Sequence, residues 1–496
     1  MRAARNVIVM INDGAGWGTW DAAAYWQYGS REGTPYADFP VKYAMTTYPL
    51  NNEDGPTGDD ESLVNYDAGR AWETDPHDEP DFAFKAYEYL DDDATDSAAA
   101  GTALASGVKT YNNGINMDNR GKAVPFITQL ARARGKATGV VTSVPFSHAT
   151  PAAFGAQALS RKHRQKIARQ MLEAGDLDLI MGMGAPGHNV NGTACGSLAA
   201  GESRKGCDEP EEYLATKDWK RLEAGRIIPR GQTRPWTVIR DREAFEAMAD
   251  GHLKAKGPLI GLPRGAADGT LQQGREAGIT GRDASRPSGV AFVKGVPTLA
   301  TMTRAALTHL QQDPDGIFMM VEGGATDWAA HTSDACAGSS SWNRQYNPDC
   351  DGVQLGRLIE ETADFNDAVA AVVAWVERHS SWDETLLIVT TDHDNSMPMG
   401  PDADRVPFQP VQNRGKGRMP GLSLRATGDH SNALVPLWAR GAGAEAFAQR
   451  VRGRDPAYGR HVGLSDGTYV DNTDVHAVMV SALTGRPVAG IRVGRR

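Results

Sequence analysis

Residues 386–393 read Leu-Leu-Ile-Val-Thr-Thr-Asp-His, an apolar run that ends in a carboxylate and an imidazole. Two other apolar runs also end in a carboxylate, one from Asn6 to Asp13 and one from Gly316 to Glu322. Short continuous apolar runs are typical of strands buried on both faces of a parallel sheet. Because the carboxyl ends of parallel strands meet in one crevice, we expect these side chains to form a single site. Carboxylates and a histidine in one place indicate a bound metal ion.

Helical periodicity alternates with strand-like runs along most of the chain. We expect strands at residues 7–11, 137–144, 177–182, 317–321, 386–391 and 433–439. We expect helices at residues 126–134, 164–174, 299–310 and 355–378. This alternation predicts an α/β fold, a doubly wound three-layer sandwich with a large, mostly parallel central sheet.

The candidate ligands are spread over nearly the whole chain, so one continuous sheet must gather them. We therefore expect a single catalytic domain over residues 1–496 rather than two or three separate domains. Surface insertions are expected where Gly, Pro, Asn and Asp are frequent, near residues 50–80, 184–235, 333–352 and 396–429.

The composition is that of a soluble globular protein, with 40% hydrophobic and 23% charged residues among 496. The formal net charge of -10 argues against a nucleic-acid-binding surface. It also means that a phosphate-like ligand needs a locally cationic pocket, which bound metal ions would supply. No run of 18 or more apolar residues is present, so no membrane span is expected.

The four cysteines of the chain indicate whether the protein resides in an oxidising or a reducing cellular compartment. Cys195 and Cys207 flank one loop, and Cys336 and Cys350 flank another. Two short-loop disulfides would place the protein in an oxidising compartment, periplasmic or secreted. Four free thiols, or a metal site that uses all four, remain open alternatives. Met1 leads almost directly into the first strand, as in a cytosolic protein or in a mature form whose export signal was removed.

Three short motifs carry the candidate chemistry. Asp327 and His331 are four residues apart, so on a helix they can share one ion, although a surface capping pair has the same spacing. Glu322, at the end of an apolar strand, needs a partner if it is buried, and a cation is such a partner. Asp392 and His393 follow their strand without a turn signal; the alternative is a solvated Asx turn.

Residues 95–107 predict a short helix that is capped by Thr95 or Asp96 and ended by Gly107. Ser97 would lie in its first turn. Free N–H groups and a partial positive charge at a helix N-terminus favour a phosphoryl group beside that hydroxyl. The alternative is that Ser97 only contributes to the cap.

These segments, in this order, closely resemble alkaline phosphatases. The matching stretches are residues 6–14, 96–110, 147–152, 321–331, 391–393 and His430. The resemblance implies an enzyme that hydrolyses phosphate monoesters to an alcohol and inorganic phosphate through a phosphoserine at Ser97. It further implies two Zn²⁺ ions and one Mg²⁺ ion per chain, and a homodimer.

The resemblance assigns a role to each matching residue. The zinc ion that activates the Ser97 hydroxyl would be held by Asp13, Asp392 and His393. The other zinc ion would be held by Asp327, His331 and His430. The magnesium-type site would be formed by Asp13, Thr150 and Glu322, whose oxygen ligands suit a hard cation.

Three further residues are expected near the phosphate. Arg161 falls where the family carries its phosphate-clamping arginine, which can donate two parallel hydrogen bonds. His148 and Trp328 occupy positions that vary in this family and neighbour the third metal and the phosphate. As a ligand, His148 would favour a transition metal in place of magnesium.

Two matters stay open at this point. Residues 336–350, with Trp342 and Tyr346, shape access for bulky substrates or form an insertion without a catalytic part. The alternative functions are a phosphodiesterase or sulfatase of the same superfamily, and a relative that binds phosphate without catalysing hydrolysis. A sulfatase would need the pattern C/S-x-P-x-R, which the sequence at Ser97 lacks.

Overall fold

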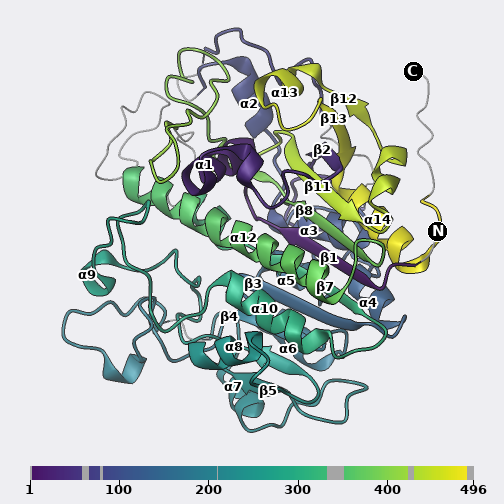
Figure 1. The fold of residues 1–496 in the computed structure, drawn as a ribbon, viewed down its shortest axis with the longest axis vertical. Coiled ribbons are helices and arrows are strands. Elements are labelled where there is room, and N and C mark those ends of the chain that lie inside the picture. The colour runs from purple at the N-terminus through teal and green to yellow at the C-terminus, as the bar shows by residue number, and fades with distance from the viewer. Residues whose placement is uncertain are drawn as a thin grey trace.

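The computed structural model describes residues 3–58, 66–78, 82–208, 211–331, 351–422 and 429–488. Within these ranges, one sheet of eleven strands runs through the centre of the molecule in the order β12-β13-β2-β11-β8-β1-β7-β3-β4-β6-β5 (Figure 1). Its strands are β1 (Asn6–Ile11), β2 (Val41–Thr46), β3 (Ala137–Pro145), β4 (Leu179–Met183), β5 (Thr237–Ile239), β6 (Leu259–Gly261), β7 (Ile317–Glu322), β8 (Thr385–Thr390), β11 (Val435–Gly441), β12 (Gly453–Arg454) and β13 (Thr468–Asp471). Of these, β11 and β12 run opposite to β1, and the others run parallel to it.

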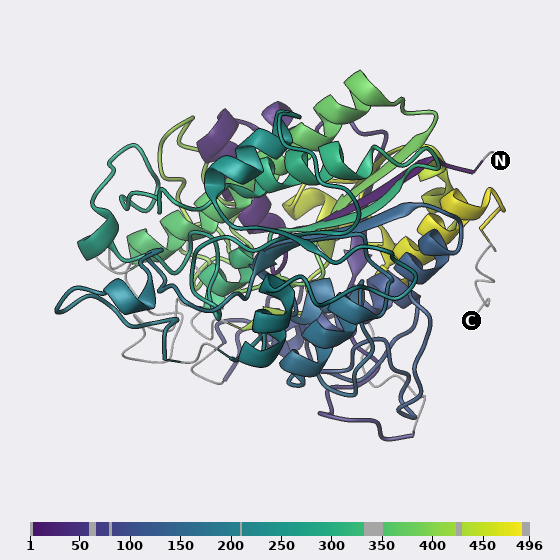
Figure 2. The same ribbon diagram turned by 90° about the horizontal axis from the view of Figure 1, so that it is seen from below.

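Helices cover both faces of this sheet, which Figure 2 shows close to edge-on. One face carries α1 (Trp17–Tyr28), α8 (Arg242–Ala249), α10 (Leu299–Leu310) and the long α12 (Asp351–His379). The other face carries α3 (Ser97–Ser106), α4 (Ile127–Arg132), α5 (Ala149–Ala153), α6 (Arg164–Glu173), α7 (Thr216–Glu223) and α14 (Asn472–Thr484). The predicted α/β sandwich with a large, mostly parallel sheet is confirmed.

Shorter elements lie around these layers. The short helices are α2 (Lys85–Asp91), α9 (Ala277–Thr280), α11 (Ala325–His331) and α13 (Pro456–His461). A separate antiparallel ribbon pairs β9 (Asp394–Asn395) with β10 (His430–Ser431). This ribbon and α11 bring additional polar residues to the carboxyl edge of the main sheet.

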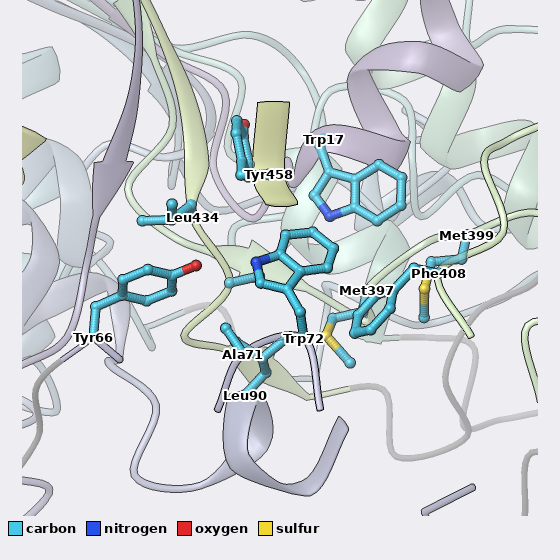
Figure 3. A pocket seen from close by; sticks show the side chains of 11 residues that line it. Trp17, Tyr66, Ala71, Trp72, Leu90, Met397, Met399, Phe408, Leu434 and Tyr458 are labelled. Atoms are coloured by element: carbon cyan, nitrogen blue, oxygen red, sulfur yellow. The ribbon is translucent and has the colours of Figure 1, made fainter. Parts of the chain in front are cut away.

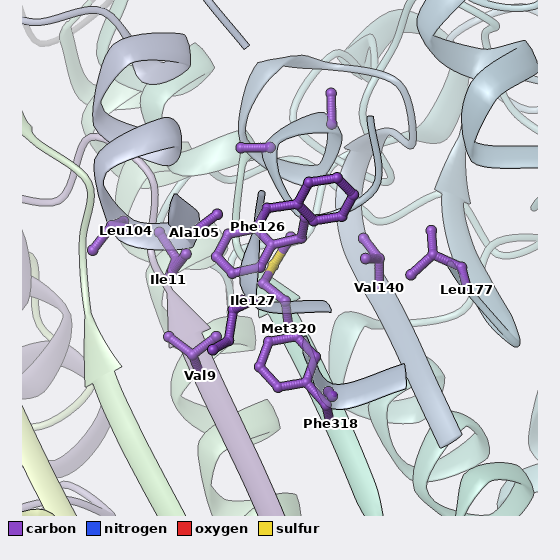
Figure 4. Close-up of a cluster of buried hydrophobic side chains, with 14 of the residues drawn as sticks. Val9, Ile11, Leu104, Ala105, Phe126, Ile127, Val140, Leu177, Phe318 and Met320 are labelled. Carbon is purple, nitrogen blue, oxygen red and sulfur yellow. The ribbon is translucent and has the colours of Figure 1, made fainter. Parts of the chain in front are cut away.

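The sheet has a packed apolar layer on each face because its central strands are apolar at every position. On one face, Val9, Phe318 and Met320 pack against α3 and α4, as Figure 4 shows with Leu104 and Ile127. Alternate residues of the same strands point to the opposite layer, beneath α10 and α12. Burial on both faces explains why the sequence shows continuous apolar runs in place of alternation.

The helices and strands begin and end close to the predicted residues, and the structure adds the direction of one strand that had not been predicted. The helix predicted over residues 95–107 is α3, which begins after the N-cap Asp96 and ends at Gly107, where φ is 73°. The Asp96 carboxylate accepts a hydrogen bond from the Ala99 amide (2.9 Å). The strand expected at 433–439 spans 435–441 and lies antiparallel to β8, which the apolar pattern did not specify.

Cys195 and Cys207 form a disulfide with an S–S distance of 2.07 Å. The second expected pair, Cys336 and Cys350, lies outside the described residues, as do Trp342 and Tyr346. No helix in the described part of the chain is long and apolar enough to cross a lipid bilayer. The single-domain interpretation of residues 1–496 remains a prediction.

Phe318 provides a test of the core. It is fully buried on β7 and stacks on Phe154, with ring centroids 6.3 Å apart. We expect Phe318→Ala to lower the free energy of unfolding by about 3–5 kcal/mol, since it removes buried surface and leaves a cavity. Leu159→Ala, at a side chain that is 44% exposed, is the control and should cost about 0.5 kcal/mol or less. Equal losses for both variants in chemical denaturation would contradict this assignment of the core.

Candidate metal centre

The strand register places the predicted ligands at one level of the sheet. Ile11 at the end of β1 pairs with Glu322 on β7 and with Thr390 on β8. The chain continues from these strands to Asp13 and Asp392, so three carboxylates meet at the carboxyl edge of adjacent strands. Asp13, Glu322 and Asp392 are each 0% exposed. The expected convergence of these strand ends is therefore seen in the structure.

Helix α3 brings Ser97 to this edge from the side. Ser97 is its first residue and is 1% exposed. Its Oγ lies 3.2 Å from Nε2 of His393, which follows β8. The hydroxyl thus lies at the positive end of a ten-residue helix and next to the buried carboxylates.

One group of possible metal ligands lies between α11 and the β9–β10 ribbon. It consists of Asp327, His331 and His430, whose ligand atoms all lie within 4.8 Å of one another. Nε2 of His331 is 3.4 Å from one Asp327 oxygen, and Nε2 of His430 is 3.4 Å from the other. The two imidazole Nε2 atoms are 3.1 Å apart. This is the group of three that the sequence predicted.

Two further groups share Asp13. Asp13, Asp327 and His393 form one of them, and Asp13, His148 and Glu322 form the other. Asp392 joins the first, because its Oδ2 lies 3.3 Å from Nε2 of His393. Thr150 lies close by as well, with its Oγ1 3.4 Å from Oδ2 of Asp392. All eight predicted metal ligands therefore lie in one connected cluster.

Backbone carbonyl groups fix the orientation of two imidazole rings. Nδ1 of His393 lies 3.3 Å from the Asp394 carbonyl oxygen, and Nδ1 of His430 lies 2.7 Å from that of Thr95. Donation from Nδ1 leaves the Nε2 lone pair of each neutral ring directed into the cluster. Metal-binding histidines are commonly oriented by a hydrogen bond of this kind.

Some carboxylate oxygens of this cluster are buried without a hydrogen-bond donor in the described part of the structure. Among the described residues, neither carboxylate oxygen of Asp13 accepts a hydrogen bond, and Oε1 of Glu322 accepts none. Burial, with the charges of Asp392 and Asp327, raises the pKa of Asp13 well above its usual value. Burial also raises the pKa of Glu322 to about 8 and that of Asp392 to about 6. Cations at this position would remove the penalty, so the donor set fits bound metal ions.

Arg161 and His148 lie on the open side of the cluster. Nη1 of Arg161 donates to Oδ2 of Asp96 and Nη2 to Nε2 of His148, both at 3.0 Å. Burial, then the charge of Arg161, lowers the pKa of His148 well below its usual value. The indole of Trp328 contacts the His148 ring, with centroids 5.6 Å apart. All three line a pocket of about 510 Å³ together with Ser97.

An apolar cluster supports the β9–β10 ribbon from behind. The chain leaves β9 through Met397 and β10 through Leu434, and both side chains line an apolar pocket around Trp72 (Figure 3). The Trp72 ring packs on Phe408, with centroids 4.5 Å apart. This packing supports the ribbon that carries the candidate ligand His430.

Several residues around the ligands were not identified from the sequence. Nδ2 of Asn395 donates to Oδ1 of Asp327 (2.7 Å), and the Thr142 hydroxyl donates to Glu322. Oδ1 of Asn12 accepts from the Thr326 hydroxyl (2.8 Å). Their nearness to the predicted ligands along the chain or on a neighbouring strand is the only signal that could have indicated them.

Comparison with known proteins agrees with this architecture. The family described as alkaline phosphatase matches residues 70–341. Alkaline phosphatase 4 of Bacillus subtilis is 30% identical over 390 residues, which cover 78% of this chain and 61% of that protein. Streptomycin-6-phosphate phosphatase of Streptomyces griseus is 30% identical over 390 residues, covering 72% of this chain and 75% of that protein.

The alkaline phosphatase of Escherichia coli is 26% identical over 502 residues, covering 97% of this chain and 86% of that protein. Among solved structures, the alkaline phosphatase of the Antarctic bacterium TAB5 superposes with a TM-score of 0.55 at 20% identity, over 98% of this chain and 99% of that chain. The chain belongs to the alkaline phosphatase family, as its sequence motifs indicated. It spans 61% and 51% of the lengths of two Bacillus subtilis relatives.

Gly14 tests how closely the cluster is packed. Its φ is +69°, and a Cβ atom there would lie 2.8 Å from Oδ1 and 2.9 Å from Cα of Asp327. We expect Gly14→Ala to displace Asp327 and to lower the affinity for metal ions, with zinc as the probe, by about 10-fold or more. Gly251→Ala is the matched control, because φ is +75° and nothing lies within 4 Å of the added Cβ. Equal zinc content in both purified variants, measured by elemental analysis across a chelator titration, would contradict the expected packing.

Proposed function

We propose that the protein hydrolyses phosphate monoesters to an alcohol and inorganic phosphate through a covalent phosphoserine at Ser97. The observation that carries this proposal is the position of the Ser97 hydroxyl. It lies at the N-terminus of α3, in a pocket also lined by Arg161, and 3.2 Å from the imidazole of a buried carboxylate-rich cluster. Membership of the alkaline phosphatase family supports the same reaction.

In the first step, Oγ of Ser97 attacks phosphorus, and the bond from phosphorus to the alcohol oxygen breaks. The Ser97 proton leaves its oxygen as the new bond forms, and the departing alcohol takes up a proton. In the second step, water attacks the phosphoserine from the side that the alcohol has left. Inorganic phosphate departs, and Ser97 regains its proton.

Arg161 orients the phosphoryl group in this reaction. Its guanidinium lines the pocket beside Ser97 and is held from behind by Asp96 and His148. A planar guanidinium can donate two parallel hydrogen bonds to phosphate oxygens and can stabilise their charge as the bonds change. The free N–H groups of the first turn of α3 add to this stabilisation.

The proposed metal ions comprise two Zn²⁺ and one Mg²⁺. Asp13, Asp392 and His393 would hold one zinc, and Asp327, His331 and His430 the other. When bound, such ions lower the pKa of a hydroxyl group or a water molecule and stabilise the charge on a leaving oxygen. Asp13, Thr150 and Glu322 would hold the magnesium.

The hydrogen bond from Arg161 to His148 favours magnesium in the third site. If Nε2 of neutral His148 accepts from Arg161, the ring proton is on Nδ1, and neither nitrogen then offers a lone pair to a metal. The remaining donors are oxygen atoms, which suit a hard cation. Solved structures of two TAB5 alkaline phosphatase variants, in which a histidine is replaced by glutamate or by aspartate, are described as having Mg bound in a site named M3.

Further parts of the proposal concern the whole protein. We propose an exported, periplasmic or secreted enzyme, consistent with the Cys195–Cys207 disulfide. We also propose a homodimer and a single catalytic domain with surface insertions. A higher turnover of phosphate monoesters than of diesters or sulfate esters would separate this function from its superfamily alternatives.

Ser97→Ala tests the proposed nucleophile. We expect the variant to lose at least about 10³-fold in kcat and to form no phosphoenzyme, because the attacking oxygen is absent. Its zinc and magnesium contents should match those of the native protein at about two and one per chain. Phosphate labelling after an acid quench, together with elemental analysis, measures both. Native-like labelling of the variant would remove Ser97 from this role.

His148→Ala and Thr150→Val separate phosphate positioning from magnesium binding. We expect His148→Ala to weaken inorganic phosphate inhibition about 5- to 10-fold, because Arg161 loses a hydrogen-bonding partner. Thr150→Val should weaken magnesium binding about 10-fold or more while its effect on phosphate is smaller. Magnesium titrations of the zinc-loaded proteins provide the comparison. An equal loss of magnesium affinity in His148→Ala would make that histidine a metal ligand.

A further inference from the structure

The pocket at Ser97 is larger than a phosphoryl group requires. Its volume of about 510 Å³ is in the range of sites that enclose whole small-molecule ligands. Besides the residues of the metal centre, Lys205 and Arg357 line it. The proposed hydrolysis gives no task to either cation, so both are available to contact the alcohol part of the substrate.

Arg357 is half-buried on α12, and none of the carboxylates that the structure describes forms an ion pair with it. Its Nη2 donates to the Arg275 carbonyl oxygen (2.5 Å), and within the described residues its buried Nε has no hydrogen-bond partner. The acidic groups that face Arg357 are Glu276, Glu360 and Glu361, and none of the described carboxylates forms an ion pair with it.

Two of these carboxylates are compensated. Glu360 pairs with the fully buried Arg275 at 2.5 Å and accepts hydrogen bonds from Ser288. Burial, then the charge of Asp364, raises the pKa of Glu361 to about 8, so that group is mostly neutral at pH 7. The positive charge of Arg357 therefore remains effective toward the pocket.

Lys205 is exposed, but its backbone and the two residues that follow make close contacts with the rest of the protein. Its carbonyl oxygen accepts a hydrogen bond from the Val190 amide (3.0 Å). The adjacent Gly206 packs so closely on Ala266 that a Cβ atom would lie 2.4 Å from the Ala266 Cβ. One residue further, Cys207 is joined to Cys195. No carboxylate of the described residues forms an ion pair with the Lys205 ammonium group, so its charge faces the solvent of the pocket.

From this arrangement we infer that the site prefers phosphate monoesters whose alcohol part carries a second anionic group, a phosphate or a carboxylate, bound by Lys205 and Arg357. This inference rests on the proposed monoesterase function. The net charge of -10 repels such polyanions at long range, so the two cations matter at the pocket itself. A charge-assisted hydrogen bond to each would hold the anion and orient the ester toward Ser97.

The test uses a set of alkyl phosphates that differ at the far end of the chain. The end group is a methyl, a carboxylate or a phosphonate, and the phosphonate cannot be hydrolysed as an ester. With the metal-loaded native protein, we expect kcat/KM for the phosphonate-terminated ester to exceed that of the methyl-terminated ester by about 10-fold at the best chain length. This advantage should decrease as ionic strength rises.

Lys205→Gln should lower this ratio of kcat/KM values about 3-fold or more, and Lys205→Gln with Arg357→Gln about 10-fold. Lys220→Gln is the matched control, because Lys220 is exposed on α7 and does not line the pocket; it should leave the ratio unchanged. Since Lys205 is exposed, the single variant tests the inference even if the double variant does not fold.

The outcomes are distinct. An advantage for the phosphonate alone identifies phosphate as the second group, and an advantage for both anions identifies negative charge in general; either supports the subsite if Lys205→Gln reduces it. Equal kcat/KM for all three esters, or a ratio that Lys205→Gln leaves unchanged, overturns the subsite while leaving the hydrolysis proposal intact. Failure of the native protein to hydrolyse any of the esters would instead refute the proposed function.

Discussion

The structure depends on one electrostatic constraint: several carboxylates are buried together, and in the described part of the chain no lysine or arginine forms an ion pair with Asp13, Glu322 or Asp392. Asp13, Glu322 and Asp392 have no exposed surface, and burial together with the charge of at least one neighbouring carboxylate raises the pKa of each. Such an arrangement is stable either with protons on the acids or with cations among them. At a pH where these acids would otherwise ionise, bound cations are the more favourable solution, and such ions would also provide positive potential in an acidic protein.

Several strands and helices hold the candidate ligands in position around this cluster. The adjacent strands β1, β7 and β8 fix the carboxylates, because their register is set by a sheet that is buried on both faces. The β9–β10 ribbon and α11 then add histidines above the sheet edge. Asp96 links Ser97 to Arg161, since its one carboxylate caps α3 and pairs with Arg161. The proposed nucleophile and the proposed phosphate-binding group are thus positioned by the same side chain.

Much of this could be predicted from the sequence because buried parallel strands leave a clear pattern. The apolar runs before Asp13, Glu322 and Asp392 gave the central strands, and the cap residues of α3 gave the helix that begins at Ser97. Short edge strands such as β5 and β12 were not predicted, since two or three residues carry too little periodicity. The direction of β11 was also undetermined, because an apolar run is the same in either orientation.

Residues that join the site through tertiary structure left no pattern in the chain. Lys205 belongs to a polar insertion and Arg357 to a long helix, and neither neighbours a predicted ligand in sequence. Only the assembled pocket brings them near Ser97.

The candidate metal ligands extend from Asp13, just after the first strand, to His430, close to the last strands of the sheet. No fragment that lacks either end of this range holds the complete set of candidate donors. A proteolytic cut followed by loss of the N-terminal or C-terminal piece would therefore disrupt the proposed centre as a whole. Metal content consequently reports whether a chain has reached its full native topology.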